Sequence, residues 1–309
     1  MGTGRIRNRI GIDLGGTKIE GAILDATGEI THRERTVTPV GDYIATVAAV
    51  RDLVCTLEQR LGDRCAIGVG IPGALSPATG LIKNANSTCL IGHPLDRDLA
   101  AALDRPVRLA NDADCFALSE ATDGAGMGAP IVFGAILGTG VGGGVVVHGR
   151  LLSGPNAIAG EWGHSPVPWP HDRERPGTLC YCGKRGCIET FLSGGGLARD
   201  HLAATGERQD ASEIAAGAAA GDPSAQATLD RYADRLARSL ACVINLIDPH
   251  VIVLGGGLGR IERLYRSVPT LWARYVFSDT VATRLLPPRF GDASGVRGAA
   301  WLWPPEVSG

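Results

Sequence analysis

One pattern occurs twice in the sequence: an apolar strand, a glycine-rich turn and a second apolar strand. The first copy, RIGIDLGGTKIEGAIL, spans residues 9–24, and the second, IVFGAILGTGVGGGVVV, spans residues 131–147. Each copy precedes segments in which strand and helix patterns alternate. Two units that open with the same hairpin and continue with alternating elements predict a duplicated α/β fold.

The spacing of apolar residues predicts the remaining elements. A helix is expected from about Asp42, which can cap it, and its apolar stripe would comprise Ile44, Val47, Val50, Val54 and Leu57. The runs CAIGVGIPG and PVRLA predict short strands; the second strand ends at Asn111 and Asp112, and a helix starts immediately afterwards with ADCFALSEA. In the second half, residues 224–248 predict a long amphipathic helix, and residues 251–254 predict a strand before the turn GGGLG.

The length of 309 residues allows two lobes, each with its own core. We place the boundary in the segment near residues 121–130, which gives a first lobe of residues 1–121 and a second lobe of residues 122–294. The last helix, within about residues 295–309, is expected to return to the first lobe. The active cleft is expected between the two lobes.

The composition excludes several classes of protein. A net charge of −2 and an aromatic content of 5% supply neither the basic surface nor the stacking side chains of a nucleic-acid-binding protein. No apolar run reaches the length of a membrane-spanning helix, and the N-terminus lacks the apolar core of a secretory signal. We therefore expect a cytoplasmic protein whose eight cysteines are thiols or metal ligands and not disulfides.

Three glycine-rich turns follow apolar strands and are candidates for phosphate binding. In DLGGTK, the carboxylate of Asp13 could hold a magnesium ion through water while Thr17 and Lys18 meet phosphate oxygens across Gly15 and Gly16. An ordinary hairpin turn with a surface lysine is the alternative, and it is favoured for this turn taken alone. The other two turns comprise Gly138, Thr139 and Gly140, and Gly255, Gly256 and Gly257.

The second turn contains the letters of the dinucleotide fingerprint G-x-G-x-x-G, at Gly138, Gly140 and Gly143. In that motif the glycines lead into a helix, whereas here they lead into the strand VVVHGRLL. We therefore interpret the turn as a hairpin whose glycines let a polyphosphate approach the backbone. The third turn follows a strand and precedes a helix, and it would lie under a nucleotide base or ribose.

Residues 160–190 gather two histidines, three cysteines and three glutamates in a stretch without helical or strand periodicity. His164, Cys180, Cys182 and Cys187 are the ligand types of a structural zinc site, which is a closed tetrahedron. Their C-x-C-x4-C spacing is tighter than the common C-x2-C knuckle, and buried thiols beside a core histidine are the alternative. The other cysteines lie in apolar or mixed stretches and are expected to be plain thiols.

Taken together, DLGGTK, NDAD at 111–114, GTGVGGG, GEWGH and CYCGKRGCIE resemble the motifs of the ROK family (repressors, open reading frames and sugar kinases) over essentially the whole chain. The resemblance implies an α/β, two-lobed, actin-like ATPase fold related to ribonuclease H, which works with ATP and Mg²⁺ and carries a structural Zn²⁺ ion. Within the family, IPGALSPATGLIKNANSTCLIG, GEWGHSPVPWP and GDASGVRGAAWLWP are most similar to bacterial manno(fructo)kinases.

The resemblance also implies roles for individual residues. Asp112 would be the base that takes the proton of a sugar's 6-hydroxyl, with Asn111 bonded to a neighbouring hydroxyl; a helix N-cap is the alternative for Asp112. Glu161 and Glu189 would accept hydrogen bonds from the hexose, and His164 would touch both the sugar and the zinc. The full set of expected sugar-binding residues is Gly73, Asn86, Asn111, Asp112, Glu161, His164 and Glu189.

These expectations lead to an ATP-dependent hexose 6-kinase, with fructose favoured over mannose and glucose as its substrate. A glucokinase or an N-acetylhexosamine kinase of the same family is the alternative. A regulator of the family would carry a helix-turn-helix before DLGGTK, where only twelve residues precede Asp13, and a sugar-binding protein without catalysis would not need Asp112. Both are therefore disfavoured. The expected partners are a hexose and ATP, and a homodimer is left open.

Overall fold

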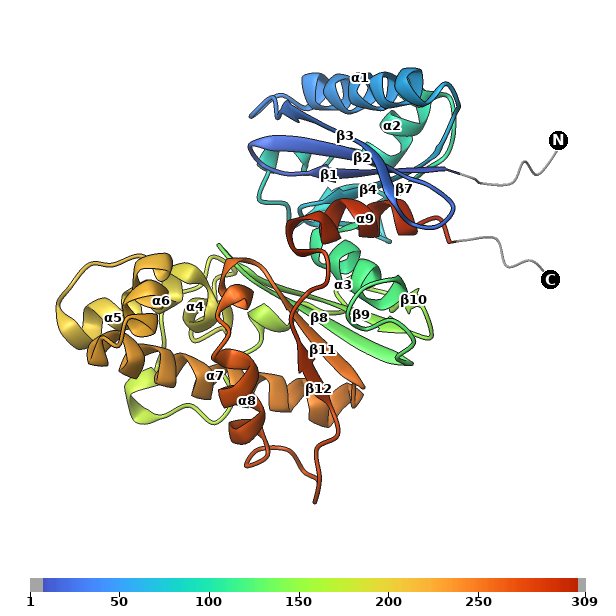
Figure 1. Cartoon of the computed structure of the whole chain (residues 1–309). Coiled ribbons are helices and arrows are strands. Elements are labelled where there is room, and N and C mark those ends of the chain that lie inside the picture. Colours follow the sequence, from blue (N-terminus) through green and yellow to red (C-terminus); the bar gives the residue numbers. More distant parts are fainter. Residues whose placement is uncertain (1–7, 305–309) are drawn as a thin grey trace. The chain divides into compact units, whose positions relative to one another are not determined.

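The computed structural model describes residues 8–304, which divide into two compact units (Figure 1). The first unit comprises the described residues up to Met127, the segment Gly144–Ala159 and the described residues from Asp292 onward. The second unit comprises Gly128–Gly143 and Gly160–Gly291. The ends of the predicted first lobe and of the predicted last helix, residues 1–7 and 305–309, lie outside the described residues.

The first sheet has the strand order β3-β2-β1-β4-β7. The hairpin β1 (Arg9–Leu14) and β2 (Lys18–Leu24) is antiparallel, as predicted, and β4 (Ala66–Ile71) and β7 (Val107–Asn111) continue the sheet in parallel with β1. The edge strand β3 (Ile30–Val37) was not expected from the sequence. Most of its side chains are exposed, so the run ITHRERTV lacks the apolar pattern of the other strands.

The second sheet has the order β10-β9-β8-β11-β12, which repeats the order of the first sheet strand by strand. The strands are β8 (Ile131–Leu137), β9 (Val141–Val147), β10 (Arg150–Leu151), β11 (Val251–Gly255) and β12 (Arg284–Leu286). As in the first sheet, β11 runs parallel to β8 and to β12. The predicted duplication of an α/β unit is therefore confirmed. A small third sheet pairs β5 (Ala74–Leu75) with β6 (Ile82–Lys83).

Helix α1 (Tyr43–Leu61) begins where the sequence predicts, because the side chain of Asp42 accepts the N–H of Ala45. The predicted apolar stripe is wrong at Ile44, which is 79% exposed. Ile44 lies about 120° around the helix from Val50 and so faces away from the buried side. The residues that are buried on α1 are Thr46, Val50, Leu53, Val54 and Leu57.

Helix α9 (Ser294–Trp301) packs against β1, β4 and α3 (Asp112–Thr122) in the first unit. Three glycines allow the backbones to touch. A Cβ atom on Gly11 would overlap the carbonyl of Val296, one on Gly68 would overlap that of Ala299, and one on Gly298 would overlap that of Cys115. Among the described residues of this unit, α2 (Leu95–Leu103) is a further helix.

The second unit contains the helices α4 (Glu189–Leu192), α5 (Gly194–Thr205), α6 (Ala211–Ala219), α7 (Pro223–Ile247) and α8 (Leu264–Trp272). The long helix predicted for residues 224–248 is α7. Its buried arginines hold the irregular segment before the cysteines: Glu174 accepts hydrogen bonds from Arg235 at 2.7 Å and from Arg238 at 2.9 Å. Burial alone raises the pKa of Glu174, but these two guanidinium groups lower it to about 2.

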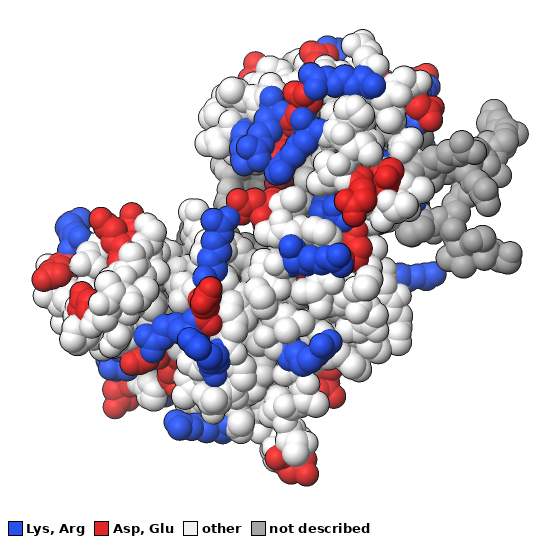
Figure 2. All heavy atoms as spheres, in the orientation of Figure 1, with Lys and Arg blue, Asp and Glu red and all other residues white. Residues whose placement is uncertain are grey.

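Side chains of both signs are scattered over the face drawn in Figure 2, in keeping with the net charge of −2. None of the helices within residues 8–304 is both long and apolar enough to cross a membrane.

Candidate functional site

Asp13 and Asp112 stand at the same edge of the first sheet. Asp13 is on β1 and pairs with Gly70 of β4, whose next residue, Ile71, pairs with Asn111 at the end of β7. Asp112 follows at once as the first residue of α3. Burial and, to a smaller extent, the nearby carboxylates of Asp112 and Glu20 together raise the pKa of Asp13 to about 6. A partly buried carboxylate beside other negative charges, such as Asp13, favours a bound cation.

Asn111, and not Asp112, is the N-cap of α3. Its Oδ1 accepts the N–H of Ala113 at 2.9 Å, and its Nδ2 donates to the carbonyl of Gly73 at 3.1 Å. Asp112 also accepts the N–H of Ala113, at 2.8 Å, from the first position of the helix. The cap therefore does not require Asp112, and its role as a base remains a prediction.

Gly73 has a structural reason to be a glycine. Its φ is 90°, and a Cβ atom there would lie 2.9 Å from the backbone of Ala85. The residue therefore permits the close crossing of two segments, whether or not a sugar lies beside it. Asn86 directly follows Ala85 in the crossing segment, and its side chain is exposed. Contact with a sugar remains a prediction for both Gly73 and Asn86.

The DLGGTK turn is closed by its own backbone. The N–H of Gly15 donates to the carbonyl of Lys18 at 3.0 Å, and Thr38 donates its hydroxyl to the carbonyl of Gly15 at 2.8 Å. Gly16, Thr17 and Lys18 are exposed. The Nζ of Lys18 lies 3.8 Å from Glu20, so this lysine already has a weak partner within the unit. Phosphate binding by the turn remains a prediction.

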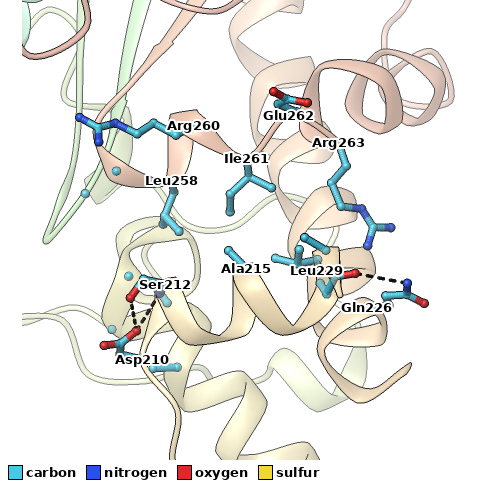
Figure 3. A pocket seen from close by; sticks show the side chains of 18 of the residues that line it. Asp210, Ser212, Ala215, Gln226, Leu229, Leu258, Arg260, Ile261, Glu262 and Arg263 are labelled. Carbon is cyan, nitrogen blue, oxygen red and sulfur yellow. Dashed lines mark hydrogen bonds between the residues drawn. The ribbon is translucent and has the colours of Figure 1, made fainter. Parts of the chain in front are cut away.

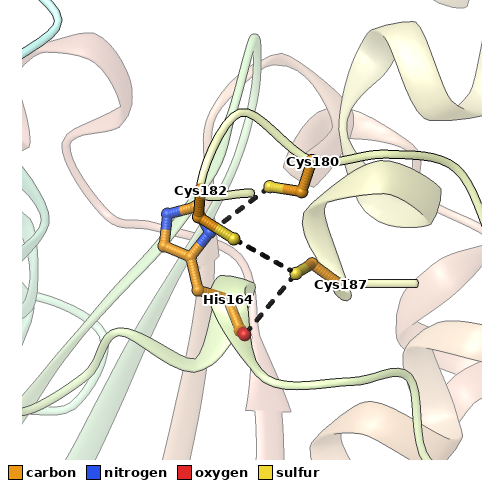
Figure 4. Close-up of side chains that lie close together, drawn as sticks. All are labelled: His164, Cys180, Cys182 and Cys187. Atoms are coloured by element: carbon orange, nitrogen blue, oxygen red, sulfur yellow. Dashed lines mark hydrogen bonds between the residues drawn. The ribbon is translucent and has the colours of Figure 1, made fainter. Parts of the chain in front are cut away.

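In the second unit, the four predicted metal ligands come together (Figure 4). Their ligand atoms all lie within 4.8 Å of one another. The Nδ1 of His164 is 3.6 Å from the Sγ of Cys180, and the Sγ atoms of Cys182 and Cys187 are also 3.6 Å apart. A tetrahedral zinc site with ordinary bond lengths has edges of roughly 3.6–3.8 Å, so this donor set fits zinc. The sulfur separation is too long for a disulfide.

The three thiols differ in their surroundings. Burial raises the pKa of Cys180, and it raises the pKa of Cys187 to about 12. A hydrogen bond from the backbone of Lys184 lowers the pKa of Cys182. Metal ligands must be thiolates, so a metal would bind here in competition with protons.

Glu189 lies between the metal ligands and the second glycine turn. Its Oε2 accepts the N–H of Val141 at 3.0 Å, and its Oε1 is 4.0 Å from the Sγ of Cys180. A Cβ atom on Gly140 would stand 2.8 Å from the same carboxylate, which explains the glycine at that position. Glu161 is half-buried and directly precedes the short 3₁₀ turn Trp162–His164. Sugar binding by the two glutamates remains a prediction.

A pocket of about 1390 Å³ opens in the second unit (Figure 3). Of the residues predicted to bind a nucleotide, Gly138, Thr139 and Gly257 line it. Apolar side chains converge in its middle, and polar ones stand at its two ends. The apolar residues are Ala215, Leu229, Leu258 and Ile261.

The turns at residues 138–140 and 255–257, both predicted to bind the nucleotide, line the pocket with only some of their residues. Gly140, Gly255 and Gly256 are not among the described residues that line this pocket. Gly256 has a φ of 78° and is pressed against the backbone of Leu137, so its conformation serves the β11 turn.

The helical side of the pocket was not predicted from the sequence. Gly194 and Gly195 line it from the start of α5, and the N–H of Gly194 donates to the carbonyl of Gly138 at 2.8 Å. The run of three glycines at 194–196 was the signal that could have indicated this. The small residues of α6 gave no such signal, because they look like those of any surface helix.

Comparison with known proteins agrees with this architecture. The model of the ROK family matches residues 9–306. The N-acetyl-D-glucosamine kinase of Salmonella gallinarum is 41% identical over 296 residues, covering 94% of this chain and 98% of the relative. The enzyme of the same name from Yersinia pseudotuberculosis is 39% identical, covering 94% and 97%.

Two solved structures are also similar. The ROK hexokinase of Thermus thermophilus has a TM-score of 0.83 and 33% identity, covering 95% of this chain and 96% of that one. The ROK family glucokinase of Streptomyces griseus, in complex with glucose and AMPPNP, has a TM-score of 0.77 and 28% identity, covering 96% and 98%. The duplicated sheets and these matches define an actin-like ATPase fold, as predicted. The chain belongs to the ROK family.

Proposed function

We propose that this chain transfers the γ-phosphoryl group of ATP to the 6-hydroxyl of N-acetyl-D-glucosamine. It is an ATP-dependent sugar kinase of the ROK family. The observation that carries the substrate is the full-length similarity, at 39–41% identity, to N-acetyl-D-glucosamine kinases. The preference for fructose expected from the sequence finds no support in these relatives, which favour the N-acetylhexosamine alternative.

In the first unit, Asp112 would take the proton of the attacking hydroxyl as the new O–P bond forms and ADP leaves. Its position at the carboxyl edge of the sheet suits this role, because α/β sheets present ligand-binding groups there. Asn111 is held by α3 and by Gly73, so its amide is fixed next to Asp112. Asp13 would hold Mg²⁺, which neutralises charge on the phosphates.

In the second unit, the pocket supports the binding of ATP. The apolar middle, at Ala215, Leu229 and Ile261, suits a nucleotide base. The phosphates would lie toward Gly138 and the N-terminus of α5, where the helix dipole favours anions.

The cluster of His164 and the three cysteines would hold Zn²⁺ in a structural role. Four protein ligands leave no open position for chemistry. The metal would fix the loop that carries Glu161 and leads into Glu189, the two residues proposed to accept hydrogen bonds from the sugar. The hydrogen bonds that Arg235 and Arg238 of α7 donate to Glu174 hold the same loop.

The test is an assay of ADP release with magnesium-ATP and one sugar at a time: N-acetyl-D-glucosamine, N-acetyl-D-mannosamine, glucose, mannose and fructose. We expect the highest kcat/KM with N-acetyl-D-glucosamine, and a sugar-dependent release that is about 10²–10⁴-fold slower in the Asp112→Asn variant. A protein that releases ADP with none of these sugars would contradict the proposed activity, and a preference for another sugar would contradict the proposed substrate.

A further inference from the structure

Tyr181 stands between two of the predicted metal ligands, Cys180 and Cys182, yet its side chain does not join the core. The residue is 74% exposed. Its ring meets the ring of His164 edge-on, with centroids 5.0 Å apart at 90°. Its hydroxyl lies 2.9 Å from the Nε2 of His164. Nothing in the sequence pattern assigns this residue a role.

The two nitrogens of His164 have different neighbours. Nδ1 points into the cluster, 3.6 Å from the Sγ of Cys180, whereas Nε2 meets Tyr181. A neutral imidazole carries one proton, and a metal ligand must offer a lone pair. A metal at the cluster therefore requires the proton on Nε2, where the oxygen of Tyr181 can accept it.

We propose that Tyr181 is a positioning residue for the metal centre: its hydroxyl accepts the Nε2–H of His164 and fixes the tautomer and ring orientation in which Nδ1 faces the three cysteines. This inference rests on the metal centre of the proposed function and not on the identity of the sugar. Outer groups that hold a metal-bound histidine in this way commonly contribute about 10–100-fold to metal affinity.

A phenol is neutral at physiological pH and is both a donor and an acceptor of hydrogen bonds. The hydroxyl of Tyr181 can therefore accept from Nε2–H while its own hydrogen points elsewhere. The sugar contact predicted for His164 would need the Nε2 atom that Tyr181 occupies.

The test compares the zinc affinity of the full chain with that of Tyr181→Phe, by competition with a chromogenic chelator. The variant keeps the ring and removes only the hydroxyl. Tyr275→Phe is the matched control, because the hydroxyl of Tyr275 bonds to Asp234 at 3.2 Å, away from the cysteines. We expect Tyr181→Phe to bind zinc about 10–100-fold more weakly and Tyr275→Phe to match the unmodified chain.

A second readout observes the hydrogen bond itself. In the zinc-loaded protein, the Nε2–H proton of His164 should exchange slowly with solvent by ¹⁵N NMR, and Tyr181→Phe should exchange it faster. Unchanged zinc affinity and unchanged exchange in Tyr181→Phe would overturn the inference while leaving the kinase activity intact. If both tests give the expected results but the unmodified, zinc-loaded protein phosphorylates no sugar, only the proposed function is contradicted.

Discussion

Asp13 and Asp112 lie close enough for their charges to repel each other. Burial is the larger cause and the carboxylate of Asp112 the next, and together they raise the pKa of Asp13 from an ordinary value of 3.8 to about 6. Asp13 is on β1, and Asp112 directly follows β7; both strands pair with β4, so the fold itself brings the like charges to the same edge of the sheet. Carboxylates with a pKa shifted in this way are common at sites that bind cations or transfer protons.

Because the folded protein disfavours the charged form of Asp13, we predict that Asp13→Asn gains stability in a pH-dependent way. Between pH 3.8 and about 6 the folded state holds a proton that the unfolded state has lost, so the free energy of unfolding falls as pH rises through this range and stays low above it. At pH 7.5 the variant should be more stable than the unmodified chain by up to about 3 kcal/mol, and below pH 4 the difference should vanish. Urea unfolding at several pH values measures it. Equal stability at pH 7.5 would contradict the raised pKa.

Asp112→Asn should lower kcat by about 10²–10⁴ while sugar binding stays close to normal. The amide keeps the shape of the side chain but cannot take a proton. Steady-state kinetics and calorimetric sugar binding measure the two effects. Asp104→Asn, at the exposed C-terminal end of α2, is the control. A near-normal kcat in Asp112→Asn would refute its role as base.

Ala215→Phe should raise the KM for ATP about tenfold or more and leave the KM for the sugar nearly unchanged, because the ring would fill the apolar middle of the pocket. Ala216→Phe, one position along α6 on its exposed side, is the matched control. If both variants bind ATP normally, the nucleotide lies elsewhere.

Removal of zinc should raise the KM for N-acetyl-D-glucosamine much more than the KM for ATP, because the loop beside Glu161 and Glu189 would lose its clamp. Cys187→Ser should have the same effect, whereas Cys242→Ser, which replaces a half-buried thiol of α7, should not. Metal analysis with kinetics on each variant measures this. If the purified protein is folded and active but contains no zinc, the proposal that zinc holds this loop in place is wrong.

The parts of the fold that depend on local patterns could be predicted from the sequence. Both hairpins, α7 and the capped start of α1 follow from apolar spacing, glycine turns and Asp42. The edge strand β3 was missed because its side chains are mostly polar and exposed. The packing of α9 depends on glycines far apart in the chain, Gly11, Gly68 and Gly298, which no local pattern connects.

In the candidate site, too, the features that depend on local sequence patterns could be predicted, and those that depend on tertiary packing could not. The grouping of His164 with three cysteines could be predicted from the close spacing of the cysteines and the family pattern, and the structure brings the four side chains together; metal binding by them stays a prediction. The contact between Tyr181 and His164 and the lining of the pocket by α5 and α6 depend on tertiary packing. The preferred sugar could not be predicted, because hexoses differ at a few hydroxyl or amide groups that only a few hydrogen bonds distinguish.

Direct competition between two sugars tests the central claim most closely. Equal concentrations of N-acetyl-D-glucosamine and fructose, with limiting magnesium-ATP, give a ratio of the two phosphorylated products that equals the ratio of kcat/KM values. Mass spectrometry should find N-acetyl-D-glucosamine 6-phosphate in at least tenfold excess. A mixture in which fructose phosphate predominates would contradict the proposed substrate.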